Sequence, residues 1–256
     1  MTDTEAFDQA ADWLCRARRV LAITGAGISA DSGLPTYRGI GGLYESEVTE
    51  DQVPIEAALS GQMLRQRPAL TWKYLMQIES ACRGAQPNDG HRALARMDHY
   101  LRGLTVLTQN VDGFHRAAGQ DRVIEIHGNL HRLRCAECDQ TWTVADYVGL
   151  ALPPRCDDCH GPVRPQVVLF GEALPTDALR QLDEALSEGV DLVMSIGTTS
   201  VFPYISGPVV HAARMGVPTI EINPAVSEVS SIVGLRLQAR AVDVLPRLLR
   251  RLEARA

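Results

Sequence analysis

The stretch TGAGISADSGLPTYRG, residues 24–39, decides the fold of this chain. It follows Val20–Ile23, a short apolar run typical of a parallel strand that is buried on both faces. Gly25 and Gly27 allow the backbone to turn tightly and to approach a ligand closely, which a Cβ atom would prevent. Residues 25–30 also fit the looser G-x-G-x-x-A form of a dinucleotide-binding loop. The stretch therefore predicts a strand followed by a dinucleotide site.

The second half of this stretch departs from an ordinary dinucleotide-binding unit, which continues into a long helix. Gly33 and Pro35 stop the helix within about two turns. A polar, Gly-rich segment with Tyr37 and Arg38 follows. A phosphate-binding loop joined to a basic and aromatic segment indicates a dinucleotide that is enclosed and chemically broken.

Composition excludes several classes of protein. The 256 residues are 45% hydrophobic and 22% charged, as in an ordinary globular protein. A net charge of −6 argues against direct binding of nucleic acid. No apolar run approaches the roughly 18 residues that span a bilayer, and the acidic N-terminal segment lacks the order of a signal peptide. We expect a cytoplasmic protein without a membrane partner.

Four of the six cysteines have the spacing of a zinc site. They form C-x2-C, a gap of 17 residues and a second C-x2-C, at Cys135, Cys138, Cys156 and Cys159. Disulfides are a poor alternative in a chain without an export signal. Four thiolates leave no open position for water, so we expect a structural Zn2+. His160 is an alternative ligand that the spacing does not require.

Apolar strand-like runs alternate with helical patterns along the chain, which predicts a parallel sheet built from right-handed βαβ units. The expected strands are Val20–Ile23, Leu104–Thr108, Val123–Ile126, Val167–Phe170, Asp191–Ile196 and Val217–Ile222. Residues 40–88 have mainly helical spacing, and Asn88 or Asp89 can cap a helix over His91–Met97. Further helices are expected near Thr4, over Thr176–Ser187, over Gly207–Met215 and over Val244–Arg255. The pattern is that of one α/β domain with two inserted segments.

Polar residues follow several of these strands at the carboxyl ends, where an open α/β sheet binds its ligand. They lie in Thr24–Arg38, Thr108–Asp112, His127–Gly128, Gly197–Ser200 and at Asn223. His127 can act as a general base near neutral pH, because the ordinary pKa of histidine is about 6.5. The alternatives are an Asx turn for Asn110 and Asp112 and a hydrogen-bonded core histidine for His127.

Taken together, these segments resemble the sirtuin family of NAD-dependent protein deacylases. GAGISADSGLPTYRG resembles its cofactor loop, TQNVDGFH its Gln-Asn-x-Asp motif and EIHG its catalytic histidine. The four cysteines resemble its zinc ribbon, VVLFGE its substrate strand, and GTTS and EIN its adenosine-side motifs. The matches occur in family order over about residues 20–225, nearly the whole chain.

The resemblance implies a Rossmann-like parallel sheet and a smaller lobe made of a helical insertion and the zinc ribbon. Residues 1–39, 89–129 and 166–256 would form the Rossmann-like domain. Residues 40–88 would form the helical insertion, and residues 130–165 the zinc-ribbon insertion. NAD and an acyl-lysine protein substrate would meet in the cleft between the lobes.

The resemblance also implies a role for each matching residue. The catalytic set would be His127, as the base that activates a ribose hydroxyl, with Asn110 and Asp112. NAD would be bound at its phosphates by Gly25, Ala26 and Gly27, at its ribose by Tyr37, Arg38, Gln109 and Asn110, at nicotinamide by Ile28 and Asp112, and at adenosine by Gly197, Thr198, Ser200 and Asn223. The substrate backbone would pair as an added strand with Val168, Leu169, Phe170, Gly171 and Glu172.

The products implied are nicotinamide, O-acyl-ADP-ribose and free lysine. Thr36-Tyr37 resembles the branch that removes acidic acyl groups, but its Tyr-x-x-Arg pair is replaced here by Leu75 and Ile78. An apolar pocket would leave a succinyl carboxylate unpaired, so we expect acetyl or a longer apolar acyl group. Phe202-Pro203-Tyr204 also departs from the usual proline position. Two alternatives stay open, a protein mono-ADP-ribosyltransferase and a non-catalytic NAD sensor.

Overall fold

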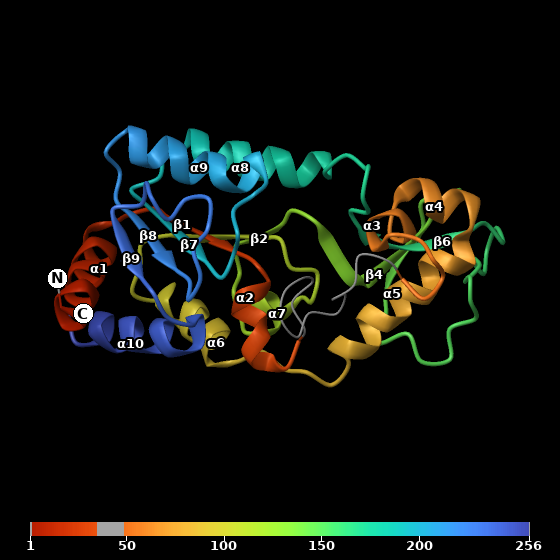
Figure 1. Ribbon diagram of the computed structural model, residues 1–256, viewed down its shortest axis with the longest axis horizontal. Helices are drawn as coiled ribbons and strands as arrows, with labels where there is room; N and C mark the ends of the chain where they lie inside the picture. The colour runs from red at the N-terminus through yellow and green to blue at the C-terminus, as the bar shows by residue number, and fades with distance from the viewer. Residues whose placement is uncertain (1, 35–48, 256) are drawn as a thin grey trace.

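The computed structural model describes residues 2–34 and 49–255, which form a larger and a smaller lobe (Figure 1). The larger lobe contains a six-stranded parallel sheet, and the smaller lobe contains short helices and a three-stranded sheet. Tyr37 and Arg38 lie outside the described residues.

The large sheet has the strand order β3-β2-β1-β7-β8-β9. Its strands are β1 Val20–Thr24, β2 Leu104–Thr108, β3 Val123–Glu125, β7 Leu192–Ile196, β8 Thr219–Ile222 and β9 Leu235–Leu237. Thr24 at the end of β1 lies in register with Thr108 on one side and with Ile196 on the other. The strand order reverses between β1 and β7, and a ligand crevice forms beyond the carboxyl ends at such a reversal.

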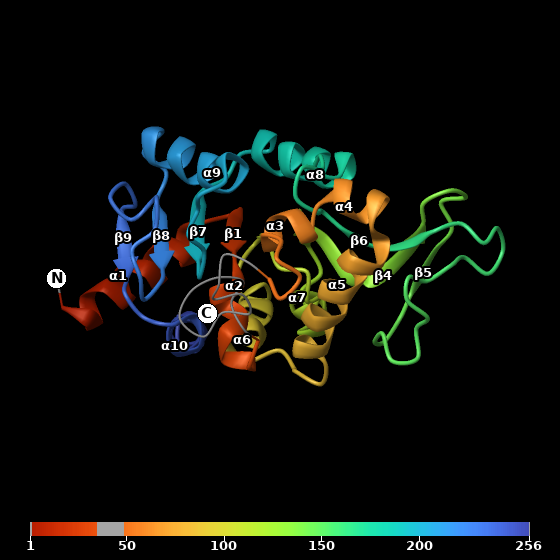
Figure 2. The same cartoon turned by 45° about the vertical axis from the view of Figure 1, so that its right-hand side comes forward.

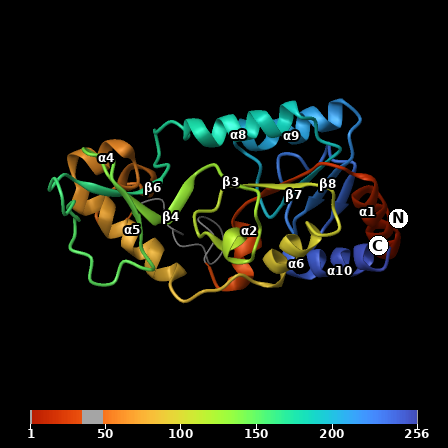
Figure 3. The ribbon, with the colours of Figure 1, turned by 180° about the vertical axis from the view of Figure 1, so that it is seen from behind.

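Helices cover both faces of this sheet (Figure 1 and, from behind, Figure 3). One face carries α1 Asp3–Arg16, α6 Asp89–Met97 and α10 Ala241–Glu253, and the other carries α8 Thr176–Ser187 and α9 Pro203–Arg214. Successive β1 side chains alternate between the two layers: Val20 packs with the first group and Leu21 with the second. The apolar run before the glycine loop is thus buried on both faces, as the sequence predicted.

The smaller lobe joins the helical insertion to the cysteine-rich segment (Figure 2). Its elements are α3 Ile55–Ala58, α4 Gly61–Gln66, α5 Pro68–Cys82, and an antiparallel sheet in the order β5-β4-β6, with β4 Gly128–Cys135, β5 Thr141–Thr143 and β6 Val163–Val167. Trp72 of α5 is buried, and its indole nitrogen donates to the carbonyl of Val163 at 3.2 Å. Its ring also meets the edge of Tyr147 at 5.6 Å. One apolar core therefore unites the two insertions.

Two expectations about strands and helices were wrong, and one strand was missed. The run Val167–Phe170 does not form a strand of the large sheet. Its first residue, Val167, instead ends β6, which pairs with β4 in the small sheet and has alternate residues buried there. Strand β9 was missed, since three residues carry too little periodicity. Helix α9 begins at Pro203 rather than Gly207, in keeping with proline at a first helical position. Strands β4 and β6 each extend beyond the expected segment boundaries, and the division into five segments stays a prediction.

Candidate active site

The carboxyl ends of the strands bring the predicted polar segments to one edge of the large sheet. Backbone hydrogen bonds join neighbouring segments at this edge. The amide of Gln109 donates to Thr24 at 3.1 Å, and the amide of Gly25 donates to Ile196 at 3.1 Å. The amide of Gly197 donates to the carbonyl of Ile222 at 2.9 Å. The segments that the sequence placed at strand ends therefore form one continuous edge.

The glycine loop is packed against the segment that follows β7. A Cβ atom on Gly25 would lie 2.8 Å from the carbonyl oxygen of Gly197, and one on Gly27 would lie 2.7 Å from the Cα of Gly197. Both glycines are therefore required by backbone packing, in addition to any approach of a ligand. The helix after them is short, since α2 covers only Ala26–Ser29 and Gly33 ends the next turn with φ of +82°. The predicted early end of this helix is confirmed.

Asn110 and Asp112 tie their loop to α2 through Ser29. The side-chain amide nitrogen of Asn110 donates to the Gly25 carbonyl at 3.0 Å and to the Ser29 hydroxyl at 3.1 Å. Ser29 in turn donates to Asp112 at 2.7 Å, and the Phe114 amide donates to the other carboxylate oxygen at 2.9 Å. Burial raises the pKa of Asp112, against the effect of these two hydrogen bonds. Asp112 thus forms an Asx turn, and both side chains lie beside the glycine loop at the carboxyl edge of the large sheet.

Two buried histidines beneath this site were missed from the sequence. His91 follows the N-cap Asn88 of α6, and its Nε2 atom lies 3.4 Å from the Ser29 hydroxyl. The His115 ring lies 5.0 Å from that of His91, and its Nε2 atom is 2.9 Å from the Thr24 hydroxyl. Burial lowers the pKa of His91 to about 4 and that of His115 to about 3. Both rings are therefore neutral at pH 7. The spacing of Asn88 and His91 signals a helix cap, but not this position.

His127 follows β3 and has a defined tautomer. Its Nδ1 atom lies 3.0 Å from the backbone carbonyl oxygen of Gln109, which can only accept a hydrogen bond. Nδ1 therefore carries the proton, and Nε2 of the neutral ring has a lone pair. Burial lowers the pKa of His127, although the hydrogen bond to Gln109 opposes this shift. Tyr204, whose hydroxyl lies 2.7 Å from Nε2, was noted in the sequence only for its unusual position.

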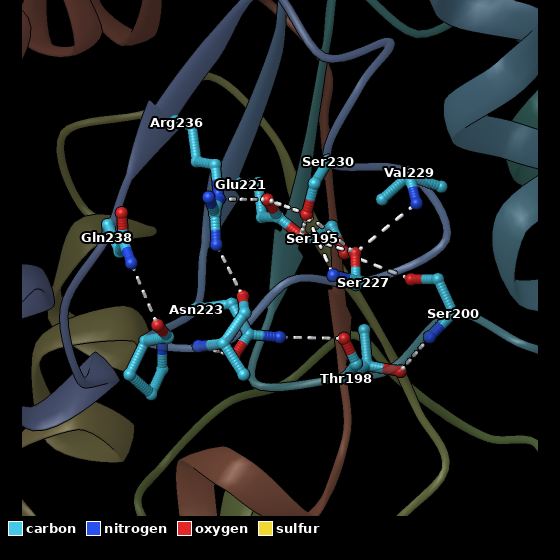
Figure 4. A network of polar contacts seen from close by, with 12 residues as sticks. Ser195, Thr198, Ser200, Glu221, Asn223, Ser227, Val229, Ser230, Arg236 and Gln238 are labelled. Carbon is cyan, nitrogen blue, oxygen red and sulfur yellow. Dashed lines mark hydrogen bonds and ion pairs between the residues drawn. The ribbon is translucent and has the colours of Figure 1, made fainter.

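A second group of polar residues lies beyond β7 and β8 (Figure 4). The side-chain amide of Asn223 donates to the Thr198 backbone carbonyl at 2.9 Å. The side-chain amide of Gln109 donates to the Thr198 hydroxyl at 2.7 Å. Ser200 is buried with φ of +57°, and its backbone amide donates to the same hydroxyl at 3.1 Å. Thr198 is thus bonded directly to the predicted ribose-binding Gln109, and Ser200 and Asn223 are connected to Gln109 through Thr198.

Glu221 fastens the loop after Asn223 and was missed by the sequence analysis. Its buried carboxylate accepts hydrogen bonds from Ser227 and Ser230 and forms an ion pair with Arg236 at 2.8 Å (Figure 4). A buried carboxylate with these partners holds the loop in one conformation, because leaving any of them unpaired would be costly.

The predicted substrate segment connects the two lobes. The Val168 amide donates to the His127 carbonyl at 2.9 Å, and the Phe170 amide donates to the Leu59 carbonyl at 3.0 Å. Glu172 is held by Arg164 through two hydrogen bonds of 2.6 and 2.7 Å. The backbone of this segment is thus already paired with the small lobe at Phe170, whose side chain is 39% exposed.

Three other predicted residues differ in burial. Ile28 is fully buried in the core on the α1 side of the large sheet. Leu75 is buried in the core of the small lobe, whereas Ile78 is only partly buried against the same core. Of the predicted acyl-pocket pair, Ile78 is therefore the more accessible.

The four predicted metal ligands converge on one point. Their Sγ atoms all lie within 4.8 Å of one another, with Cys135 and Cys159 at 3.4 Å and Cys138 and Cys156 at 3.7 Å. A tetrahedral zinc site with Zn–S bonds of about 2.3 Å places its sulfurs about 3.8 Å apart. Backbone amides of Cys138 and Glu137 lower the pKa of Cys135 to about 7, which favours the thiolate. The residues fit a structural Zn2+.

A model of the Sir2 family matches residues 25–203. The chain belongs to the Sir2 family. The chain is 50% identical over 238 residues to the NAD-dependent protein deacylase 2 of Pseudomonas aeruginosa, covering 92% of this chain and 93% of that protein. It is 37% identical to the NAD-dependent protein deacylase of Thermococcus kodakarensis, with 95% of each covered.

Solved Sir2 structures share the fold of the chain. A Sir2 homologue in complex with NAD superposes with a TM-score of 0.86 at 31% identity, covering 97% of this chain and 94% of that one. A mutant Sir2 homologue in complex with ADP ribose has the same TM-score and identity, with 96% of each chain covered. The expected membership of the sirtuin family is confirmed, as are the Rossmann-like sheet and the smaller lobe with its four-cysteine cluster.

Proposed function

We propose that this Sir2 family member is an NAD-dependent protein-lysine deacylase in which His127 is the general base. The observation that carries the proposal is the lone pair on Nε2 of a neutral histidine at the ligand-binding edge of the sheet. NAD supplies the ADP-ribosyl group that accepts the acyl group, with nicotinamide as the leaving group. His127 would accept the proton of a ribose hydroxyl at Nε2, while its Nδ1 proton stays bonded to Gln109.

The other residues at this edge would bind and orient NAD. Backbone groups of the glycine loop would meet its phosphates, and the Gln109–Thr198–Asn223 group would bind its adenosine and ribose hydroxyls. Asn110 is oriented by the Gly25 carbonyl and Ser29. Asp112 accepts a hydrogen bond from Ser29, and burial raises its pKa. Tyr37 and Arg38, outside the described residues, would cover the site and exclude water.

The acyl group removed is, in our proposal, acetyl or a longer apolar chain. A succinyl or malonyl group needs a cation for its carboxylate. Lys73 on α5 is already paired with Glu50 at 2.8 Å and Asp51 at 2.7 Å, and Arg83 at the end of α5 is paired with Glu79. These two cations, one within α5 and one directly after it, are therefore engaged, which supports the apolar preference.

Protein mono-ADP-ribosylation is the second candidate, because the same site would serve a protein side chain as nucleophile. The oriented lone pair of His127 favours deacylation, since it provides a base for a ribose hydroxyl. A non-catalytic NAD sensor is the least supported, because it needs neither this base nor the Asn110–Ser29–Asp112 chain.

Acyl-lysine proteins are the proposed substrates, and the relatives named as protein deacylases support this class. Within residues 2–34 and 49–255, no helix has the length and apolar character needed to cross a membrane. We propose a cytoplasmic location, because thiols gathered for a metal are typical of a reducing compartment, and we propose no direct binding of nucleic acid.

One experiment tests the function. The protein is incubated with NAD and a panel of acetyl-, longer apolar acyl- and succinyl-lysine peptides, and nicotinamide and O-acyl-ADP-ribose are measured by mass spectrometry. We expect both products to depend on an apolar acyl peptide. If no acyl peptide stimulates nicotinamide release, the deacylase proposal is wrong. An ADP-ribose adduct on protein without loss of acyl would instead support the transferase.

A further inference from the structure

The Tyr204 hydroxyl is hydrogen-bonded to Nε2 of His127, the atom that we propose acts as the base. The two atoms lie 2.7 Å apart. Because Nδ1 donates to the Gln109 carbonyl, Nε2 is the acceptor and the tyrosine hydroxyl is the donor. A neutral imidazole has only one such lone pair. The atom that would receive the ribose proton is therefore already hydrogen-bonded within the protein.

We infer that Tyr204 caps His127 and competes with a ribose hydroxyl of NAD for Nε2, an inference that rests on the proposed role of His127. One lone pair cannot accept from both hydroxyls at full strength, so the tyrosine bond must break before the ribose binds. The apparent affinity for NAD is then reduced by the fraction of molecules that are capped. Tyr204 is a capping residue that sets the affinity for NAD and takes no part in the chemical step.

The cap is positioned by the start of α9. Pro203 is the first residue of the helix, and the Phe202 carbonyl accepts the Ile205 amide at 2.9 Å. The Phe202 ring stacks on Tyr204 with centroids 5.4 Å apart and planes at 11°, and it meets His127 edge-on at 6.0 Å. The three rings form one aromatic cluster that orients the hydroxyl towards Nε2.

This cluster lies at the margin of the core, with part of its apolar surface exposed. The Tyr204 ring is partly buried against the layer formed by α8 and α9, whereas the Phe202 side chain is 43% exposed. Displacement of Tyr204 together with Phe202 would therefore move apolar surface that is already partly in solvent. The segment Phe202-Pro203-Tyr204, which departs from the usual proline position, thus brings the Tyr204 hydroxyl to Nε2 of His127.

The variant Tyr204→Phe tests the cap, because it keeps the aromatic stack and removes only the hydroxyl. A neutral hydrogen bond contributes about 0.5–1.5 kcal/mol, which corresponds to about a 2- to 10-fold change in affinity. We expect the Kd of ADP-ribose, measured by calorimetry, and the KM for NAD both to fall by this factor. We expect kcat to change less than about twofold, because the cap is already released in the ternary complex. The control Tyr100→Phe removes an exposed hydroxyl and should change none of these values.

Unchanged or weaker ADP-ribose binding by Tyr204→Phe, or a marked loss of kcat, overturns the inference and makes Tyr204 a support for the imidazole. If this variant is unstable, Phe202→Leu weakens the stack and should tighten ADP-ribose binding in the same direction. Calorimetry with ADP-ribose needs no turnover. Failure of the cap is therefore distinguishable from failure of the deacylase proposal, which is measured by nicotinamide release with acyl peptides.

Discussion

The Gln109 carbonyl fixes the protonation of His127. The backbone carbonyl oxygen lies 3.0 Å from Nδ1, and the side-chain amide of the same residue donates to the Thr198 hydroxyl at 2.7 Å. One residue therefore joins the proposed base to the proposed adenosine side of the site. The tautomer of the base is set by the backbone, so it does not depend on a second titratable group.

Replacement of His127 by alanine should separate binding from turnover. We expect kcat/KM for deacylation to fall at least about 100-fold, the contribution typical of a positioned general base. The Kd of ADP-ribose should change little, because the loss of the ribose hydrogen bond at Nε2 is offset by the loss of the competing Tyr204 hydrogen bond. Steady-state kinetics and calorimetry provide the two measurements. The matched control is His99→Ala, an exposed histidine outside the site; retained turnover in His127→Ala would show that another group is the base.

The pH profile should report the lowered pKa of His127. Catalysis needs the neutral ring, so activity is lost as pH falls through the pKa of the folded protein. Burial lowers this pKa below the ordinary value of about 6.5. We expect kcat/KM to be constant from pH 8 to below 6.5 and to decrease only at lower pH. An acid limb centred above pH 6.5 would contradict this assignment.

The buried pair His91 and His115 should make the fold sensitive to acid. The unfolded chain binds a proton at each below about pH 6.5, whereas the folded pKa values are about 4 and about 3. The unfolded state therefore binds more protons in this window, and the free energy of unfolding falls as pH decreases from 6.5 towards 4. Each histidine contributes up to about 1.4 kcal/mol per pH unit.

Urea titrations at pH 7, 6 and 5 measure this slope. The raised pKa of Asp112 acts in the opposite direction, because there the folded state holds the extra proton. Comparison with His115→Gln isolates the histidine contribution. The variant should lose less stability between pH 7 and 5 than the original protein, and an equal loss would rule out His115 as a contributor.

Loss of the metal should affect the smaller lobe first. Cys135→Ala removes one of four converging thiolates, so we expect less than one zinc per chain by elemental mass spectrometry. Trp72 lies in the core of this lobe, and its fluorescence should report unfolding at a lower temperature, together with lower solubility. The control Cys15→Ala changes an exposed thiol and should keep both zinc and stability. Full zinc content in Cys135→Ala would refute the ligand assignment.

Arg164 and Glu172 should fix the substrate segment. Their side chains are only 12% and 18% exposed, so Glu172→Gln leaves a poorly hydrated guanidinium without its counter-charge. We expect a loss of about 3 kcal/mol in the free energy of unfolding. The KM for the peptide should rise more than kcat falls, because the change lies in the segment that we propose pairs with substrate. Glu184→Gln breaks an exposed pair with Arg180 and should cost less than about 1 kcal/mol; equal costs would refute the structural role.

Local sequence patterns determined much of the fold. The apolar run Val20–Ile23 predicted a strand buried on both faces, and Gly33 predicted the early end of the following helix. Asn88 or Asp89 was expected to cap α6, and Asn88 does so; the cysteine spacing predicted a cluster that the structure brings together. These features depend on backbone conformation and side-chain periodicity over a few residues, so they can be read without knowledge of the tertiary contacts.

Only the tertiary structure decided how the site is connected. Ser29 meets Asp112 across 83 residues of sequence, and His127 meets Tyr204 across 77. The same holds for Phe170, which the sequence placed on a strand of the large sheet and which instead pairs with Ser60 of the small lobe. An apolar run shows that a segment is buried but does not identify its partner. The partner follows from how the two lobes pack around a shared edge, and that packing also places a tyrosine on the proposed base.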